Sequence, residues 1–448
     1  MSIKITVDSQ QKACSPIIYA SPNSTSLIID IPTSVSLAQH LHPAPNHYPL
    51  ISSSPAPTVP YQSTEPKSDR AKANVVARNG GPENTIIDEH WLREAWEQLR
   101  QERKDATWCL DRNVRTEQRD GGKRKRAEEY WSKSKSIRRK AGIKKVEENA
   151  SADPQTKPDH IGQRPPLRLQ PSGQQTNAYT ERPLDLNDIN DRLVQNPESE
   201  TVKLYTISLD PLPDASTYLI PPQSSFFQCT IRPETAAVFS QAVLGLHPHK
   251  SSTSCAGPGE FDVVVLDPPW QNRSVRNSRK YVATSGNGFD PSDPFIVLQE
   301  MLGKHISSGG TLACWITNKA CVRSHALHLF RSCGVVLDEE LVWLKVTTKG
   351  IPVLEISSLW RKPYEVCLIG KKCKDTSSYH KDETVGRRLL VAVPDIHSRK
   401  PCLRDILRPE NANYRGLEVF ARSLVANWCV WGDEVLSSAK QGERASLS

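Results

Sequence analysis

The second half of the chain alternates apolar runs with amphipathic segments, and this pattern limits its possible folds more than any other feature. Between residues 184 and 436, runs such as FDVVVL, GGTLACWIT and LLVAVP are almost continuously apolar, and helical segments such as DPFIVLQEMLGKHI separate them. Strands that are apolar on both faces are typical of parallel sheets covered by helices on both sides. The region is therefore predicted to be an α/β domain with a mostly parallel sheet. Its ligands should bind beyond the carboxyl ends of the strands.

The preceding residues have a different composition. Residues 1–88 are rich in Ser, Pro, Asn and Thr, and we expect a disordered tail because they offer too little apolar surface to offset the entropy of ordering. Residues 89–148 are predicted to form a basic helical arm that begins with an amphipathic helix. Residues 149–183 are rich in Pro, Gln and Ser and read as a linker. A C-terminal tail is expected at 437–448.

Positive charge is concentrated in one part of the arm. The whole chain has 58 Lys and Arg against 50 Asp and Glu, a net charge of +8. Residues 112–145 alone hold 14 basic and 4 acidic residues, a net +10, so the remainder carries −2. The clusters GGKRKR and KSKSIRRKAGIKK predict either a nuclear localisation sequence or an arm that binds phosphates. The alternative is a solvated, charged helix.

The cysteines and the N-terminus favour an intracellular protein. The eleven cysteines include no CxxC pair, and the polar start MSIKITVDSQQ lacks the apolar core of a signal peptide. No apolar run approaches the ~18–20 residues that span a bilayer. The histidines lack carboxylate or cysteine partners at ligand spacing, so no metal site is expected.

One tetrapeptide lies where an α/β sheet places functional residues. Asp267, Pro268, Pro269 and Trp270 directly follow the run FDVVVL. Each proline fixes its own φ and forces the residue before it into an extended conformation. The loop should therefore hold the carbonyls of Asp267 and Pro268 stiffly and offer few N–H donors. The alternative interpretation is a rigid turn closed by a buried aromatic ring.

An acceptor-rich loop of this kind suits the exocyclic amino group of a nucleobase. That nitrogen is conjugated with the ring of adenine and is a poor nucleophile. Two acceptors that hold both N–H bonds can aim its lone pair and stabilise the positive charge that grows as it attacks a methyl donor. Trp270 is predicted to offer a flat face on which the base stacks. The remaining catalysis is alignment, which needs no metal ion.

Several motifs together resemble one enzyme family. FDVVVLDPPWQNRSVRNSRKY, PPQSSF, RKPYEVCLIG, HSRKP, LEVFARS and NWCVWGDEVL occur in the family's order over about 184–436. The chain resembles the eukaryotic adenine-N6 methyltransferase family that includes the catalytic subunit of the messenger-RNA adenosine methyltransferase. It looks closest to the branch called methyltransferase-like protein four. The resemblance implies a Rossmann-like domain with permuted motif order, in which the Asp-Pro-Pro-Trp strand precedes the main cofactor strand.

The resemblance also implies S-adenosylmethionine as the methyl donor. Lys362 would contact the carboxylate of the donor, Arg422 its ribose, and Asp433 and Glu434 its ribose or adenine end. The full set of implied donor-binding residues is Thr230, Ile231, Lys362, Arg422, Asp433 and Glu434. The family usually has Asp at the position of Thr230, Asn at Asp433 and often His at Arg399.

The segment after the tetrad is predicted to bind the substrate. Its basic residues are expected at phosphates that flank a flipped-out adenine, and its polar and aromatic residues nearer the base. The predicted residues are Gln271, Asn272, Arg273, Arg276, Arg279, Lys280 and Tyr281.

These observations predict methylation of adenine N6 in a nucleic acid. RNA is the expected substrate, with small nuclear RNA and 2′-O-methyladenosine as the finer expectation. DNA adenine methylation is one alternative, and a nucleic-acid-binding scaffold with a methyltransferase fold is another. The protein is expected in the nucleus, with a cytoplasmic pool as a further option, and is expected to act without an obligate partner subunit.

Overall fold

The computed structural model gives a description for most of the predicted domain and for several segments before it. The described residues are 15–41, 48–62, 66, 68–79, 86–103, 107–114, 164–170, 184–208, 214–246, 256–270, 294–358, 361–373, 385–407 and 414–440.

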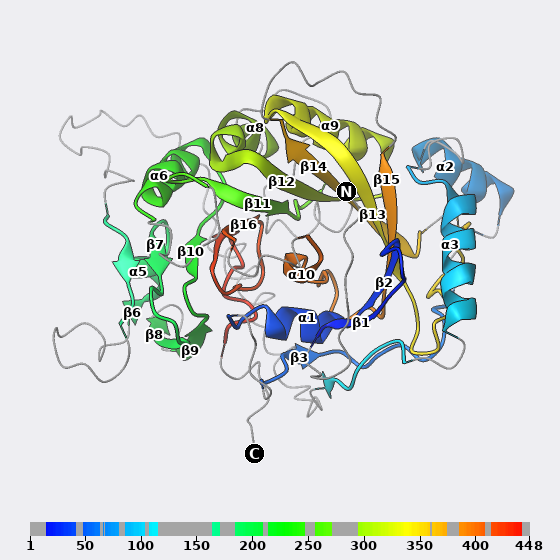
Figure 1. The fold of residues 1–448 in the computed structure, drawn as a ribbon, viewed down its shortest axis with the longest axis horizontal. Coiled ribbons are helices and arrows are strands. Elements are labelled where there is room, and N and C mark those ends of the chain that lie inside the picture. Colours follow the sequence, from blue (N-terminus) through cyan, green and yellow to red (C-terminus); the bar gives the residue numbers. More distant parts are fainter. Residues whose placement is uncertain are drawn as a thin grey trace, which may run out of the picture.

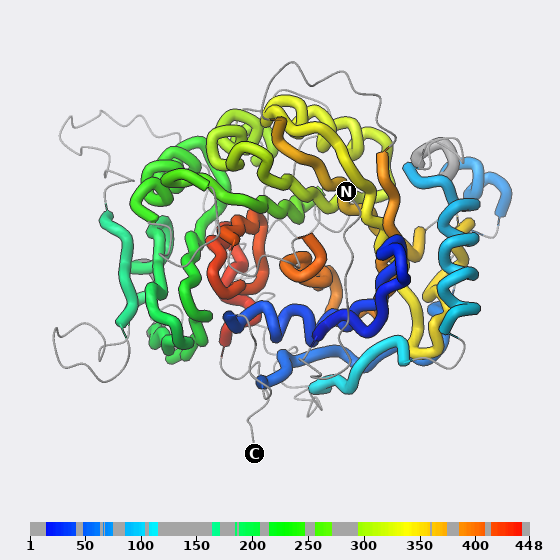
Figure 2. Tube along the Cα trace, viewed as in Figure 1, coloured from blue at the N-terminus to red at the C-terminus, as the bar shows by residue number. Residues whose placement is uncertain are grey.

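A large, strongly curved sheet forms the centre of the molecule (Figures 1 and 2). Its strands, from one edge to the other, are β1 (Ile17–Ala20), β2 (Ser26–Ile29), β15 (Gly386–Ala392), β13 (Val335–Lys345), β14 (Tyr364–Lys372), β12 (Ile306–Ile316), β11 (Phe261–Leu266), β16 (Gly416–Val419), β17 (Trp428–Gly432), β10 (Ser225–Gln228), β7 (Leu193–Gln195) and β5 (Leu167–Arg168). β11 is parallel to β12 and β16, and β17 is parallel to β16 and β10. β14 is antiparallel to both of its neighbours. The predicted α/β class and the mostly parallel sheet are therefore confirmed.

Helices cover both faces of this sheet. α6 (Pro233–Leu244), α8 (Pro294–His305) and α9 (Ala320–Ser332) pack on the convex face, and α1 (Ile31–Leu37) and α10 (Arg404–Leu407) lie on the concave face (Figure 1). β11 shows why a continuous apolar run is needed: Val264 packs in the core under α6, α8 and α9, while Val263 and Val265 pack in the core on the opposite face. Side chains alternate along a strand, so a strand buried on both faces has no polar side.

The remaining elements are small. β3 (Ser52–Ser53) pairs with β4 (Asn113–Val114), and β6 (Leu184–Asp185), β8 (Val202–Ser208) and β9 (Asp214–Ile220) form a three-stranded sheet. The other helices within the described ranges are α2 (Asp69–Asn79), α3 (Glu89–Glu102) and α5 (Leu186–Ile189). Within the described residues, no helix is both long and apolar enough to cross a membrane.

The prediction that residues 1–88 are a disordered tail is wrong for the segments that the structure describes. β2 pairs in parallel with β15 and extends the central sheet. Leu27, Ile28 and Ile29 are completely buried, and every residue of α1 is buried. Asp30 caps α1 by accepting a hydrogen bond from the backbone N–H of Thr33 at 3.0 Å. A short apolar run is enough to order this segment because the edge of the sheet supplies its hydrogen-bond partners.

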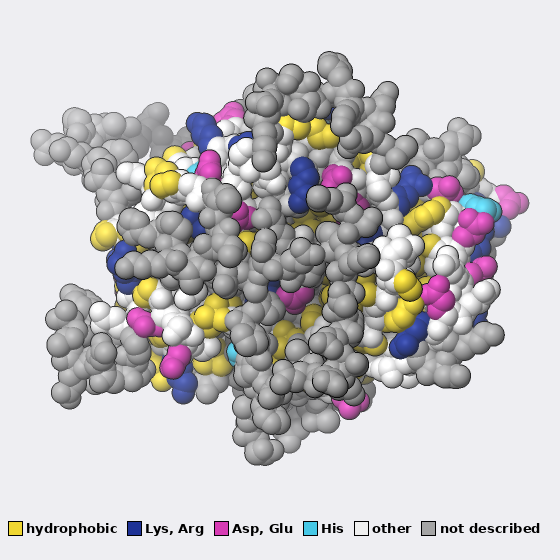
Figure 3. Space-filling model, in the orientation of Figure 1, with side chains coloured by type: hydrophobic (Ala, Val, Ile, Leu, Met, Phe, Trp, Pro, Cys, Tyr) yellow, Lys and Arg dark blue, Asp and Glu magenta, His cyan; other side chains and the backbone are white. Residues whose placement is uncertain are grey.

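The helix predicted at the start of the basic arm exists, but it belongs to the domain. α3 buries Leu92 and Leu99, and the indole N–H of Trp96 donates to the carbonyl of Gly350 at 3.2 Å. Acidic and basic side chains are interspersed on the α3 side of the face drawn in Figure 3. The basic clusters at 121–145 lie outside the described residues.

Two further boundaries differ from the prediction. β5 lies inside the expected linker at 149–183 and pairs with β7 at the sheet edge. Ala439, in the expected C-terminal tail, is buried, and its carbonyl accepts from the N–H of Leu219 at 2.9 Å. Both segments join the fold through backbone pairing with distant residues, which their own composition does not reveal.

Candidate active site

The tetrad loop lies at the carboxyl end of β11, next to the end of β16. The backbone N–H of Asp267 donates to the carbonyl of Val419 at 3.3 Å, so the loop begins as a continuation of the strand pairing. The N–H of Trp270 donates to the carbonyl of Pro268 at 2.8 Å and closes a tight turn at Pro269. A carbonyl oxygen has two lone pairs, so the carbonyl of Pro268 keeps one for another donor.

Trp270 is an anchor of this loop rather than a free aromatic face. Its side chain is only 6% exposed, and its indole N–H donates to the carbonyl of Trp315 at 2.8 Å. Its ring packs against Phe295 with ring centroids 5.1 Å apart. The sequence predicts a stacking surface for the base, whereas this burial matches the alternative of an aromatic ring that closes a rigid turn.

The carboxylate of Asp267 is held by a lysine that the sequence analysis did not select. The ammonium group of Lys400 lies 3.1 Å from one oxygen of Asp267 and 3.2 Å from Glu365. Lys345 forms a second ion pair with Glu365. Asp267, Lys400, Glu365 and Lys345 thus alternate in charge along one wall of the site.

Electrostatic coupling keeps Glu365 and Lys400, the two central residues of this row, ionised. Burial alone would raise the pKa of Glu365, but Lys400 and Lys345 lower it to about 2. Burial would lower the pKa of Lys400, but the charges of Asp267 and Glu365 and its hydrogen bonds to them raise that pKa above its usual value. Lys400 therefore stays positive beside Asp267 at any physiological pH.

Two cavities meet at Asp267. The larger has a volume of about 630 Å³. It is bordered by the whole tetrad and by Lys362, Lys400 and Tyr61. The second, of about 370 Å³, is bordered by Asp267, Lys400 and Glu418 and by Val35 of α1. Burial, followed by the charge of Asp267, raises the pKa of Glu418 to about 8. Glu418 is therefore largely protonated at neutral pH and adds a neutral acid to a charged site.

Most of the residues implied for the donor come together in a cleft that joins this site. Thr230, Ile231, Arg422, Asp433 and Glu434 line it, and Asp267, Pro269 and Phe420 border it on the tetrad side. Phe420 has a φ of 62°, an uncommon conformation for a residue with a side chain, and it turns the chain sharply after β16. This turn brings Arg422 to the cleft, where its guanidinium lies 3.3 Å from Glu434.

The cleft compensates for one departure from the family pattern. The side chain of Thr230 interacts with the carboxylate of Asp433 across the cleft, and burial raises the pKa of Asp433 although that interaction lowers it. The carboxylate that the family usually carries at position 230 is thus replaced by one that faces it from position 433. Two carboxylates, an arginine and the apolar surfaces of Ile231 and Phe420 suit the ribose hydroxyls and the adenine of a nucleoside. The chemistry of these residues fits S-adenosylmethionine, and the cleft, with a volume of about 30 Å³ in this structure, must open to hold the nucleoside.

Lys362 reaches the larger cavity, but its partner is unexpected. Its ammonium group forms an ion pair with Glu89 of α3, and the hydroxyl of Tyr364 also donates to Glu89 at 3.4 Å. Lys400 lies closer to the tetrad. The position of Lys400 after the strand LLVAVP is a signal that the sequence contains. Glu365 gives no such signal, because it lies at the start of an antiparallel strand whose direction the sequence does not reveal.

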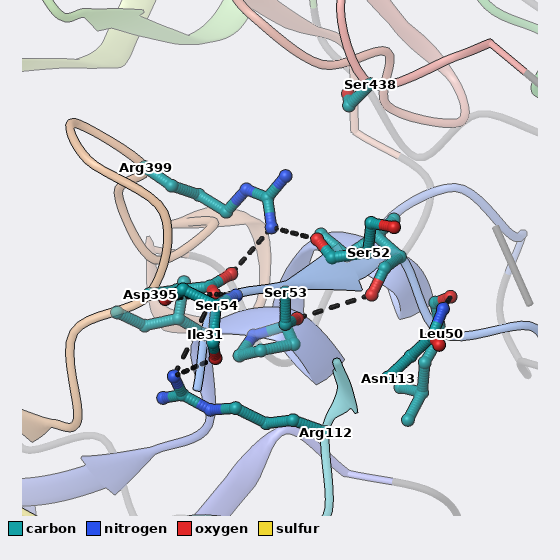
Figure 4. Close-up of polar contacts among 12 residues, drawn as sticks. Ile31, Leu50, Ser52, Ser53, Ser54, Arg112, Asn113, Asp395, Arg399 and Ser438 are labelled. Carbon is teal, nitrogen blue, oxygen red and sulfur yellow. Dashed lines mark hydrogen bonds and ion pairs between the residues drawn. The ribbon is translucent and has the colours of Figure 1, made fainter. Parts of the chain in front are cut away.

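Segments from before Val114 hold the loop that carries Lys400 (Figure 4). Arg112 donates to the carbonyls of Val393 and Pro394, each at 2.9 Å, and lies 3.8 Å from the buried carboxylate of Asp395. Asp395 accepts from the N–H of Ser54 at 2.9 Å and from Arg399 at 2.6 Å. We call Arg112, Asp395, Arg399 and Ser54 the loop clamp.

The residues predicted to bind the substrate lie outside the described residues. They are Gln271, Asn272, Arg273, Arg276, Arg279, Lys280 and Tyr281. Across the described ranges, no group of three or more His, Cys, Asp or Glu side chains is arranged to hold a metal ion.

Comparison with known proteins identifies the domain around this site. The MT-A70 family model matches residues 261–434. The N6-methyladenosine RNA methyltransferase MTA1 of Cryphonectria parasitica is 43% identical over 188 residues, which cover 39% of this chain and 52% of that protein. The N(6)-adenine-specific methyltransferase METTL4 of Homo sapiens is 31% identical over 262 residues, 55% of this chain and 47% of that protein.

A third relative carries a different substrate in its name. The DNA N6-methyl methyltransferase of Caenorhabditis elegans is 33% identical over 169 residues, 37% of this chain and 43% of that protein. The chain spans about half the length of the curated relatives it matches. The matched region contains the tetrad, Glu365, Lys400 and the acidic side of the donor cleft. Residues 261–434 are therefore a domain of the MT-A70 family, whose named relatives are N6-adenine methyltransferases.

Proposed function

We propose that this protein methylates the N6 amino group of adenine in RNA, with S-adenosylmethionine as the methyl donor. The single observation that carries the proposal is the position of Asp267. Its carboxylate lies at the junction of the donor cleft and the larger cavity, and Lys400 fixes it there. A carboxylate at this junction can reach a base in the cavity and still border the donor.

The residues of the site would act by positioning and by charge. Asp267 would accept one N–H bond of the adenine amino group, and the free lone pair of the Pro268 carbonyl is a candidate acceptor for the other. Trp270 would keep the loop rigid through its hydrogen bond to Trp315. The negative charge of Asp267 would stabilise the positive charge that develops on N6.

The donor cleft would hold the nucleoside part of S-adenosylmethionine. Asp433 and Glu434 would accept from its hydroxyls, Ile231 and Phe420 would contact its adenine, and Lys362 would be the partner of its carboxylate. When bound, the donor supplies an electrophilic methyl group. Because Lys362 is paired with Glu89 in this structure, donor binding at Lys362 would require that ion pair to open.

RNA is the favoured substrate, and DNA is the second candidate. The name of the MTA1 relative specifies RNA, and the name of the worm relative specifies DNA. The resemblance to the branch of methyltransferase-like protein four favours small nuclear RNA, with 2′-O-methyladenosine as the target nucleoside. Incubation with isotopically labelled donor and separate RNA and DNA pools, followed by mass spectrometry of the nucleosides, decides between them.

The same experiment separates an enzyme from a scaffold. Label in N6-methyladenosine that is lost in an Asp267→Asn variant would support catalysis at the tetrad. Absence of label in both pools, together with nucleic-acid binding and no heat of donor binding in calorimetry, would favour the scaffold.

We also propose that the single chain is active and resides in the nucleus. The clamped N-terminal segments complete the wall of the site within one chain, which supports activity without a partner subunit. Turnover by a purified monomer tests activity without a partner subunit.

The nuclear location is tested by deletion of residues 121–145, which should move a fluorescent fusion out of the nucleus while turnover on short RNA survives. If the fusion stays nuclear and affinity for long RNA falls at low salt, the basic clusters act as a phosphate-binding arm instead.

A further inference from the structure

A proline-rich segment ends at the larger cavity, which its last residue, Tyr61, borders. It runs from Ser54 to Tyr61 with the sequence SPAPTVPY. At its start, the N–H of Ser54 donates to Asp395 within the loop clamp (Figure 4). Farther along, the carbonyl of Pro57 accepts from the N–H of Thr348 at 2.9 Å.

The end of this segment is also fixed. The backbone N–H of Tyr61 donates to the carbonyl of Val353 at 2.8 Å. Three prolines within eight residues restrict φ at alternate points and reduce the freedom that the segment would otherwise lose on binding. Tyr61 is therefore a side chain on a restrained backbone.

The ring of Tyr61 is exposed although it borders the catalytic cavity. Tyr61 is 51% exposed. By contrast, Trp270 is 6% exposed, and Trp315 and Trp343, which border the same cavity, are each 2% exposed. An aromatic ring left half exposed at the rim of a cavity offers the surface that base stacking needs. Trp270, which the sequence favoured for this role, lacks that surface.

A cation borders the same cavity as this ring. Arg361 is exposed, borders the same cavity and forms no ion pair with any residue that the structure describes. By contrast, Lys345, Lys400 and Arg399 on this wall are paired with carboxylates. A cation that pairs with no described carboxylate, on the same cavity as an open aromatic ring, suits a nucleotide, which has a phosphate and a base.

We propose that Tyr61 stacks on the base of a nucleotide next to the target adenine, and that Arg361 contacts a phosphate of the same strand. This subsite rests on the proposed function, because it presumes a target adenine at Asp267. It requires an unpaired strand, since a base inside a duplex has no free face. The protein should therefore prefer single-stranded or looped nucleic acid.

The matched control lies two residues away. Val59 belongs to the same segment and is 63% exposed, but it is absent from the cavity lining. Tyr61→Ala removes the ring, Tyr61→Phe keeps it, and Val59→Ala tests any general effect of changing the segment. Arg361→Gln removes the cation.

The experiment measures binding of single-stranded RNA and DNA nine-mers with one central adenine and 2-aminopurine as the neighbouring base. Tyr61→Ala should weaken binding by about 5- to 100-fold and abolish the quenching of 2-aminopurine that the wild type causes. Tyr61→Phe and Val59→Ala should bind like the wild type. Arg361→Gln should lower the slope of log affinity against log salt by about 0.7. Donor affinity, measured by calorimetry, should be unchanged in Tyr61→Ala.

Different failures have different meanings. If the wild type methylates an oligonucleotide while Tyr61→Ala binds and quenches equally well, Tyr61 is an ordinary surface tyrosine and the subsite is refuted. If the wild type binds and quenches but methylates no adenine in either pool, the proposed function fails while stacking at Tyr61 stands. If Tyr61→Phe binds as weakly as Tyr61→Ala, the hydroxyl matters rather than the ring, and stacking is refuted.

Discussion

The tetrad loop and the segments before Val114 border the same cavity, yet their sequences encode structure in different ways. β11 is a six-residue strand that is apolar except for Asp262 and is buried along its whole length, so its local sequence already describes most of its environment. β2 is equally buried, but its four residues SLII sit among Ser, Asn, Thr and Pro. Its order comes from pairing with β15, some 360 residues later in the chain. Composition therefore identifies the centre of a sheet more readily than a peripheral strand that depends on distant partners.

The comparison also separates two ways of building a catalytic wall. The β11 side supplies the group that would touch the substrate, Asp267. The N-terminal side supplies Arg112 and Ser54, which hold the loop of Lys400, and Val35, which borders the cavity of Glu418. If this division is correct, substitutions on the first side should abolish turnover with little loss of stability, and substitutions on the second side should affect both.

The largest effect is expected at Asp267. Asp267→Asn keeps the shape of the side chain but removes its charge, so turnover should fall by about 1,000-fold, as when a preorganised electrostatic group is lost. Donor affinity and unfolding free energy should change little, because Lys400 keeps Glu365 as a partner. Steady-state kinetics and calorimetry with S-adenosylmethionine measure both. Asp338→Asn, at an exposed carboxylate of β13, is the control. Near wild-type turnover in Asp267→Asn would contradict the assignment of the tetrad.

The next effect tests the N-terminal side. Arg112→Met removes hydrogen bonds to three backbone carbonyls, those of Ser54, Val393 and Pro394. The unfolding free energy should fall by about 2–4 kcal/mol, because the carbonyls and Asp395 lose a buried partner. Turnover should fall by about 10- to 100-fold, because the loop no longer holds Lys400 in position beside Asp267. Denaturant titration and kinetics measure the two quantities.

Arg164→Ala is the control for this prediction, since Arg164 and Asp188 form an exposed ion pair and its loss should change stability by less than about 1 kcal/mol. An Arg112→Met protein that kept both its stability and its turnover would show that the N-terminal segments contact the domain without contributing to its stability or activity.

The sequence predicted the elements around the tetrad because their patterns are local. α9 ends just before Gly334, whose positive φ of 71° is typical of a glycine that terminates a helix. The strand FDVVVL and the helix at α8 were predicted correctly. Each of these depends on the spacing of apolar residues or on one glycine.

The parts of the site that were missed depend on contacts far apart in the chain. Glu365 faces Lys400 only because β14 runs antiparallel to its neighbours, which brings the start of that strand to the catalytic edge. The burial of Trp270 depends on Phe295 and on the carbonyl of Trp315. Lys362 was assigned to the donor without knowledge of Glu89, which reaches it from α3. No local pattern reports such partners.

A smaller effect is expected in the donor cleft. It tests whether donor affinity requires a carboxylate at one particular position or only a carboxylate that faces the cleft. Asp433→Asn removes a carboxylate that faces the cleft, so the dissociation constant of S-adenosylmethionine should rise by about 10-fold. Thr230→Asp in the same protein returns a carboxylate from the opposite side and should restore affinity to within about threefold of the wild type. Calorimetry measures both, with Glu234→Gln, an exposed carboxylate at the start of α6, as the control. Failure of the double variant to recover would mean that the two positions are not equivalent.

A pH dependence of stability links both sides of the site through Glu418. Its folded pKa of about 8 lies above the usual value near 4.3, so the folded protein keeps a proton that the unfolded chain has released between these values. The contribution of this group to stability is therefore complete below about pH 4 and is lost as pH rises, by at most about 1.4 kcal/mol per pH unit, until about pH 8. Glu418→Gln should remove this slope in denaturant titrations from pH 5 to 8, whereas Glu300→Gln, at an exposed carboxylate of α8, should retain it.

A substitution at Val35 tests whether the N-terminal segments influence the pKa of Glu418. Val35 borders the cavity of Glu418 from α1, in the region that the sequence suggested was disordered. Val35→Ser should admit water to that cavity, lower the desolvation of Glu418 and move the upper end of the slope below pH 8. If Val35→Ser leaves the slope where it is in the wild type, the N-terminal segments do not set the electrostatics of the site. The β11 side then builds the catalytic environment alone, and the role of the N-terminal side is limited to holding the loop of Lys400.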